Sequence, residues 1–277
     1  LSYNKLQTDR KTTETGNTKQ NYFGYRDAVN WTGTYNFDLD NRIVYGAEGE
    51  FDASRYIGDY APSQNGWNKY QFDKYTDESI VSQFFDYQFR PLEKLYTTFG
   101  LRSDKHSTVG RKTSGRTTLA YRLDNISTIR SSWGTGVRFP ALYDIHYATG
   151  NTNTSGGGSY SGDGWNNVTA DDLKSERANS FDVGYETYLE DLGLDFEVNY
   201  FNIEVKNPLN GDMRNNWKVN NTNGVNTSKG IELGLGYSPD DKKYAIDFDY
   251  TFTDSYDSNT CDSQIVGSNR GCGLEGD

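Results

Sequence analysis

Several residue types and patterns are scarce in this sequence of 277 residues, and each scarcity argues against a class of protein. No apolar run approaches the roughly 18 residues that a transmembrane helix needs, so the sequence predicts no membrane-spanning helix. Methionine occurs once and proline five times, and a long helical pattern is hard to find. The composition therefore favours strands and turns over helices.

Basic charge and histidine are also scarce. The 39 Asp and Glu residues outnumber the 28 Lys and Arg residues, which gives a net charge of -11. This balance leaves no surplus of cations to neutralise phosphates and argues against a nucleic-acid partner. The two histidines are distant in sequence and no GxSxG motif occurs, so a Ser-His-Asp active site is not expected. We expect a protein that is not an enzyme.

Cysteine occurs only twice, at Cys261 and Cys272, within one polar segment. Their closeness favours a local disulfide in an oxidising compartment, with free thiols as the alternative. A metal site would want more ligands than these two residues supply.

Aromatic residues and glycine are abundant, with 22 Tyr, 14 Phe, 5 Trp and 29 Gly. Many lie in segments where apolar and polar side chains alternate, which is the period of a β-strand. About eleven such segments follow one another, the first of them partial. The mean hydropathy of -0.87 does not exclude membrane strands, because only alternate residues of such strands meet lipid.

The connections between these segments alternate in length. Those near 39–42, 90–93, 124–127, 190–193 and 238–243 are short, whereas the intervening ones are longer, as at 52–78. Short turns on one rim and long loops on the other are typical of outer-membrane barrels. The sequence therefore predicts an all-β fold, an antiparallel up-and-down transmembrane β-barrel segment with short periplasmic turns and long extracellular loops.

The polar face of the segments carries many charges, such as Glu48, Arg122 and Asp249. A compact sandwich core could not bury so many of them, since each unpaired burial costs several kcal/mol. This face must meet water or a polar plug. A soluble carbohydrate-binding β-sandwich stays as an alternative because of the aromatic loops, and a general porin stays as another.

Four motifs follow one another over the second half of the chain: RFPALYDIHY at 138–147, LKSERANSFDVGYE at 173–186, NYFNIEVKNPL at 199–209 and NTNGVNTSKGIELGLGY at 221–237. Their order and spacing resemble the barrel of TonB-dependent outer-membrane receptors, particularly the vitamin B12 and siderophore receptors. The resemblance is less distinct over the remaining residues. Pro140 marks where strand pairing ends, because proline cannot donate to a ladder. Glu176 and Arg177 are expected to pair at the rim.

The resemblance implies that residues 1–277 are an interior part of a barrel of about 22 strands. The plug domain, the energy-coupling box and the last strands would lie outside this sequence. It also implies active uptake of cobalamin or an iron-siderophore in the outer membrane of a Gram-negative bacterium. The implied partners are the lipid bilayer, the plug of the same chain and, through that plug, the TonB complex. No cofactor is implied.

Two sets of site residues follow. Aromatic residues of the long loops could capture a ligand, although packing of the loops on themselves is an alternative. These are Tyr56, Tyr60, Trp67, Tyr70, Tyr143, Tyr147, Trp165 and Trp217. The resemblance also implies a plug-facing wall of Arg102, Arg116, Arg130, Glu186, Glu197, Gly230, Glu232 and Gly234. Its glycines would let a plug approach closely, or would only bend the strands.

Metal sites are the last possibility. Asp171 and Asp172 offer oxygen ligands for Ca2+ in an extracellular loop, with solvated acidic loops as the alternative. His106 and His146 lie near the predicted outer rim and could touch a metal-containing ligand. A lone loop histidine is more often only exposed to solvent.

Overall fold

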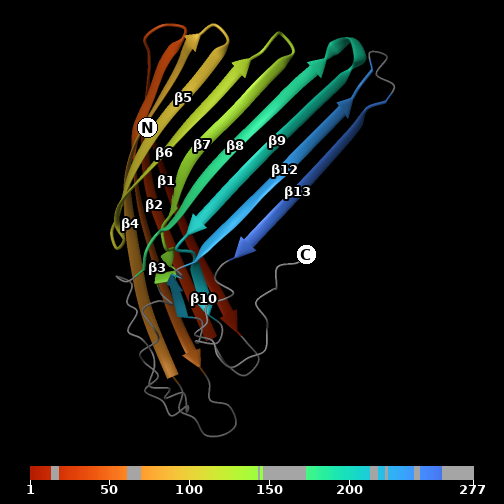
Figure 1. Ribbon diagram of the computed structural model, residues 1–277. Coiled ribbons are helices and arrows are strands. Elements are labelled where there is room, and N and C mark those ends of the chain that lie inside the picture. Colours follow the sequence, from red (N-terminus) through yellow and green to blue (C-terminus); the bar gives the residue numbers. More distant parts are fainter. Residues whose placement is uncertain are drawn as a thin grey trace.

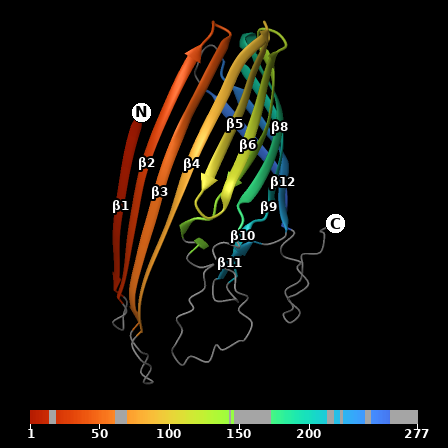
Figure 2. The same cartoon turned by 90° about the vertical axis from the view of Figure 1, so that its left-hand side faces the viewer.

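The computed structural model describes residues 1–13, 19–60, 70–142, 144–145, 173–212, 218–221, 224–239 and 244–257. Their main element is one antiparallel sheet of eleven strands, paired in the order β1-β2-β3-β4-β5-β6-β7-β8-β9-β12-β13. The strands lie side by side and the sheet curls, with β1 and β13 as its edges (Figures 1 and 2). The expected all-β fold of eleven sheet strands is confirmed.

The bounds of the first seven strands are β1 Ser2–Thr13, β2 Lys19–Asn36, β3 Asn41–Tyr60, β4 Tyr70–Leu92, β5 Leu95–His106, β6 Gly110–Arg122 and β7 Ser127–Arg138. The sheet continues with β8 Glu176–Leu189, β9 Leu194–Lys206, β12 Val225–Tyr237 and β13 Ile246–Asp257. A separate hairpin pairs β10 Leu209–Asp212 with β11 Lys218–Asn221. It lies at the end of the sheet opposite the short turns (Figure 1).

The short turns are built by local hydrogen bonds. In the turn after β6, the Asp124 carboxylate accepts the backbone N–H groups of Ile126 and Ser127, at 2.9 and 2.7 Å. These bonds lower the pKa of Asp124, because they stabilise its charged form. In the turn after β8, the short 3-10 helix Glu190–Leu192 ends at Gly193, which has φ 61°. Glycine adopts this left-handed conformation without a steric penalty.

Several strands are longer than the sequence pattern predicts. Residues 52–78 were expected to form one long loop, but β3 runs to Tyr60 and β4 begins at Tyr70, so most of this stretch is a paired ladder. β4 has 23 residues, about twice the 9–11 residues that a strand needs to cross a bilayer. The excess lies beyond the apolar part of the wall, where both faces can be polar. Alternation therefore fails to mark these strand ends.

The sheet has almost no hydrophobic core of its own. Ala53, Ile145 and Leu173 are the buried hydrophobic residues of the part that the structure describes. On the convex face, strands in the middle of the sheet carry large apolar side chains. Trp133 of β7 and Phe181 of β8, for example, are 46 and 40% exposed. Water is an unfavourable environment for so much contiguous apolar surface.

This apolar belt ends at a charged residue on the loop side of β13. On β13 the outward side chains are apolar from Ile246 to Phe252, and the next outward residue is Asp254. Asp254 forms an ion pair of 3.4 Å with Lys229 of β12. An apolar band bounded by charged side chains is the pattern of a lipid-facing barrel wall. No helix among the described residues is long and apolar enough to cross a membrane.

Candidate functional site

The concave face of the sheet is a polar wall whose charged side chains pair across strands. Glu186 of β8 lies directly opposite Glu197 of β9, an arrangement that is repulsive by itself. Arg130 of β7 reaches both carboxylates, with Nη2 at 2.9 Å from Glu186 and 3.4 Å from Glu197. One guanidinium therefore holds three neighbouring strands together electrostatically.

A second cluster lies closer to the loop end of the wall, around Arg102 of β5. Its guanidinium contacts Glu48 of β3 at 2.6 Å and Asp104 at 2.8 Å. Asp104 in turn accepts a hydrogen bond from the buried Ser82 hydroxyl at 2.6 Å. Arg116 of β6 crosses to Asp86 of β4 at 2.8 Å. Each of these arginines therefore has a carboxylate partner within the wall itself.

The residues expected to face a plug all lie on this inner face. Arg102, Arg116, Arg130, Glu186 and Glu197 form the ion pairs described above, and Glu232 accepts a hydrogen bond of 3.1 Å from Asn199. Whether a plug contacts them stays a prediction. The structure adds that each of these side chains already has a partner in the wall, which a motif alone does not reveal.

The inner-face glycines are less bare than expected. A Cβ atom on Gly230 would meet the ring of Phe201 at 2.7 Å and would also collide with the backbone oxygen of Phe252. Phe201 therefore covers this part of the wall. At Gly234 a Cβ atom would be 3.6 Å from both Asp249 and Glu197, which is ordinary contact. The proposed approach of a plug to these two glycines remains untested.

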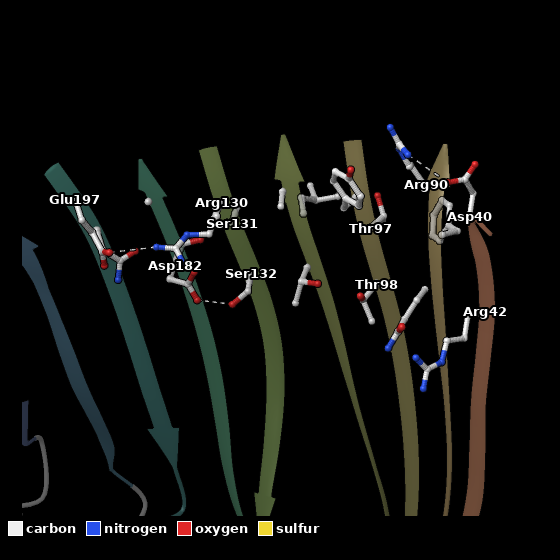
Figure 3. A pocket seen from close by; sticks show the side chains of 18 of the residues that line it. Asp40, Arg42, Arg90, Thr97, Thr98, Arg130, Ser131, Ser132, Asp182 and Glu197 are labelled. Carbon is white, nitrogen blue, oxygen red and sulfur yellow. Dashed lines mark hydrogen bonds and ion pairs between the residues drawn. The ribbon is translucent and has the colours of Figure 1, made fainter. Parts of the chain in front are cut away.

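A cavity of about 880 Å³ lies near the short-turn end of the sheet. Its lining includes Arg42, Thr98, Ser132, Asp182 and Glu197. Figure 3 shows Arg130 directed at Glu197 and Ser132 directed at Asp182, while Arg42 lies apart on β3. The lining is mostly polar and carries charges of both signs. It can hold water or a polar protein surface, which would solvate or pair these charges.

The RFP motif and the LKSER motif meet in a compact cluster at the loop end of β7 and β8. Arg138 contacts Glu176 at 2.9 Å and Asp144 at 3.5 Å. Asp144 also accepts the backbone N–H of Ala141 at 2.9 Å, and Glu176 accepts that of Leu209 at 2.7 Å. The hydrogen bond with Glu176, together with the two carboxylates, raises the pKa of Arg138.

The expected pair of Glu176 and Arg177 is wrong. The partner of Glu176 is Arg138, which lies directly opposite it on β7. Arg177 is the next residue of the same strand, so its side chain points to the other face of the sheet. Adjacent strand residues cannot pair in the way that adjacent loop residues can, and β8 begins at Glu176.

A small apolar core lies at the same end of the sheet as this cluster. Ile145 and Leu173 are buried, and Leu209 packs against them. Pro140 is fully buried at the end of β7. Asn221 donates to the backbone oxygens of Lys174 and Asn207, at 2.9 and 2.7 Å. The strand ends before and after residues 146–172 are thereby fixed to each other and to the β10–β11 hairpin.

His106 is a buried structural residue. The sequence had suggested either contact with a metal-containing ligand or simple exposure to solvent. Its side chain is 1% exposed and its ring stacks on Phe139 of the RFP motif, with centroids 4.9 Å apart. Its Nδ1 atom accepts the backbone N–H groups of Thr108 and Val109. The Nε2 atom is then the donor, and it contacts the Glu78 carboxylate at 3.0 Å. His106 therefore links the loop end of β5 to the RFP motif.

The structure places only part of the expected aromatic ligand site. Tyr56 lies in β3 instead of a loop and stacks on Tyr22 of β2, with ring centroids 4.2 Å apart. Tyr60 and Tyr70 are opposite each other at the end of the β3–β4 ladder. The other expected site residues lie outside the described residues: Trp67, Tyr143, Tyr147, Trp165, Trp217, Asp171, Asp172, His146, Cys261 and Cys272. Within the described ranges, no three His, Cys, Asp or Glu residues are placed to hold a metal ion.

Comparison with known proteins agrees with this architecture. A family model described as "TonB dependent receptor-like, beta-barrel" matches residues 1–270. No curated protein matches the sequence.

Among solved structures, the copper transporter OprC superposes with a TM-score of 0.67 at 16% identity, over 93% of this chain and 44% of that one. The siderophore receptor PirA from Pseudomonas aeruginosa gives 0.60 at 16%, over 89 and 43%. The RagAB peptide transporter gives 0.62 at 15%, over 87 and 31%. The chain thus spans less than half the length of these structures, which at such identities share its fold.

Proposed function

Because the chain belongs to the TonB dependent receptor-like β-barrel family, we propose that it forms part of the wall of an outer-membrane receptor. The complete protein would take up a scarce, large nutrient, cobalamin or an iron-siderophore, in a TonB-dependent manner. The observation that carries this proposal is the division of one curled sheet into an apolar convex face and an ion-paired polar concave face. Such a sheet suits lipid outside and a polar interior.

The wall would act as a rigid frame in this function. The backbone ladders hold the strands together, and Arg102, Arg116 and Arg130 each add an ion pair across strands, at 2.6 to 2.9 Å. Motion that admits the nutrient would then belong to a plug inside the barrel. No residue of the wall is asked to perform chemistry on the nutrient. The polar lining would instead let a polar plug or solute pass without burying unpaired charge.

The similar structures are those of a copper transporter, a siderophore receptor and a peptide transporter. Cobalamin and iron-siderophores remain our first candidates, on the resemblance of the RFP, LKSER and Gly-Ile-Glu motifs to the receptors for those compounds. Copper and short peptides serve as the competing candidates in the test.

The test uses the full-length protein in a Gram-negative host that lacks its own uptake receptors. Growth and accumulation are measured with cobalamin, several ferric siderophores, copper and short peptides, each with and without a functional TonB. We expect accumulation of one nutrient class that disappears without TonB. Uptake that is independent of TonB and falls with solute size would instead support the porin alternative.

The soluble β-sandwich alternative is opposed by the arrangement of the strands. A sandwich packs two sheets through their apolar faces, whereas here the large apolar residues of a single sheet are exposed. Recovery of the full-length protein in buffer without detergent would revive that alternative.

A further inference from the structure

Four cations lie on the convex face of the wall, beyond the apolar belt on the loop side. Lys105 of β5 lies directly opposite Arg111 of β6. Arg177 of β8 lies directly opposite Lys206 of β9. Lys105 also lies opposite Val81 of β4 in the strand register, and Val81 is an exposed apolar residue of the outer face. Lys105 and Arg111 therefore lie on the outer face too. We call these the two outer cation pairs.

Both pairs lie at a similar distance from the apolar belt, measured along the strands toward the loop side. On β5 the outward series is Leu101, Ser103 and Lys105, and on β8 it runs from Phe181 to Arg177 in the same two steps. Two outward steps are about 13 Å along a strand, and about 10 Å along the membrane normal for a tilt near 40°. This distance puts the four cations at the level of lipid headgroups.

Each pair is electrostatically unfavourable as it stands. Like charges directly opposite on neighbouring strands destabilise a sheet. Among the described residues, no carboxylate forms an ion pair with any of the four cations. This holds for Glu204 too, which lies on the same face of β9 two residues before Lys206. The contact that the structure shows is from Arg111 to the Ser103 hydroxyl, at 3.1 Å.

Several other cations of the wall have carboxylate partners, whereas Arg42, Lys112 and Arg122 of the inner face form no ion pair among the described residues. Lys229 also faces outward beyond the belt, but Asp254 neutralises it at 3.4 Å. The inner-face arginines Arg102, Arg116 and Arg130 all have carboxylate partners. On the outer surface, the two outer cation pairs therefore each place two like charges opposite each other without a carboxylate partner among the described residues.

We propose that the two outer cation pairs bind phosphate groups of anionic lipids in the leaflet around the loop side of the barrel. The inference rests on the proposed function, because it requires the wall to stand in a membrane with its long loops outward. A phosphate between Lys105 and Arg111 removes their repulsion and accepts charge-assisted hydrogen bonds from both. Arg177 with Lys206 offers the same chemistry, and each pair contains one guanidinium that can bind phosphate bidentately.

The test uses the full-length protein in dodecylmaltoside micelles containing lipopolysaccharide, or the same lipopolysaccharide with its lipid phosphates removed. Bound lipid and the thermal unfolding midpoint are measured for the unmodified protein and for the variants K105Q/R111Q and R177Q/K206Q. The control R42Q/K229Q also removes two positive charges, one on the inner face and one from a neutralised pair.

We expect the unmodified protein and the control to bind the phosphorylated lipid at least about tenfold more tightly than the dephosphorylated one, and each pair variant to lose much of this preference. The effect on stability should change sign. Without phosphorylated lipid the pair variants should unfold at the same or a higher temperature than the unmodified protein, and with it at a lower temperature.

Three results would overturn the inference. Equal destabilisation of the pair variants in both micelles would show that the cations serve the fold alone. Complete competition by millimolar inorganic phosphate would show a site for free anions. Equal loss in the R42Q/K229Q control would show an effect of net charge only. Nutrient uptake is scored separately, so a protein that binds phosphorylated lipid but transports nothing contradicts the proposed function and leaves this site intact.

Discussion

At the scale of single residues, a few buried or partly buried polar side chains decide the conformation of the rim. Glu176 and His106 are the clearest examples, since each binds groups that are distant in sequence. Each such bond contributes modestly, but loss of one partner leaves the other buried and unsatisfied, which costs about 1–3 kcal/mol. The rim is therefore the part of the wall most sensitive to single polar substitutions.

The substitution Glu176→Ala should release the Leu209 backbone N–H, which Glu176 accepts at 2.7 Å, and should leave Arg138 with Asp144 alone. We expect hydrogen exchange at the Leu209 amide to accelerate at least about tenfold, and a loss of stability near 1 kcal/mol because Arg138 is half exposed. Lys174→Ala, at an exposed side chain nearby, is the control. Unchanged exchange at Leu209 would contradict this role of Glu176.

The substitution His106→Ala should be more damaging. It leaves the Glu78 carboxylate without its donor and removes the ring on which Phe139 stacks. We expect a loss of about 2–4 kcal/mol in the free energy of unfolding, measured with urea in detergent. Combination with Phe139→Ala should cost less than the sum of the two single changes. Additive losses would show that the two rings do not stabilise each other.

At the scale of elements, close contact between β9, β12 and β13 depends on the absence of a side chain at Gly230. Phe201 of β9 lies over this glycine and the backbone oxygen of Phe252 lies beside it. The three strands are in register over this region, with Gly230 opposite both Phe201 and Thr253. The β9–β12–β13 ladder therefore has little room for change at this position.

The substitution Gly230→Ala should destabilise the protein by about 1–3 kcal/mol, because the new methyl group must displace the Phe201 ring and strain the β13 backbone. Gly49→Ala is a matched control, since a Cβ atom there meets nothing within 4 Å. That change should be neutral or slightly stabilising. Urea unfolding in detergent compares the two variants, and equal effects would refute the steric explanation.

At the scale of the whole molecule, the sheet separates two environments. Leu233 of β12 lies on the outer face between Val198 and Tyr250, while the preceding residue Glu232 lies on the inner face beside Asn199. The same chemical change at these adjacent positions should therefore have different costs. This asymmetry is the central expectation for a barrel wall in a membrane.

The substitution Leu233→Arg should cost about 2–4 kcal/mol in folding into lipid vesicles, because it puts a charge in the middle of the apolar belt. Glu232→Arg should be tolerated with a smaller loss, since its side chain faces the polar interior. Folding of the full-length protein into phosphatidylcholine vesicles, followed by its mobility on unheated gels, measures both. A greater loss for Glu232→Arg would reverse our assignment of the two faces.

The sequence alone determined the strand periodicity, the alternation of short turns with long loops, and the assignment of Arg102, Arg130 and Glu197 to the polar face. These features are local, because strand alternation and turn chemistry depend on neighbouring residues only. The same reasoning failed where both faces of a strand are polar. It therefore predicted a loop where β3 ends and β4 begins.

Only the tertiary structure decided which residues meet. The partner of Glu176 is Arg138 and not its neighbour Arg177, because β7 and β8 pair in one register. Burial of His106 against Phe139 depends on where the chain goes after β7, and coverage of Gly230 by Phe201 depends on the β9–β12 register. Contacts between distant segments follow from register and chain path, which a one-dimensional pattern does not contain.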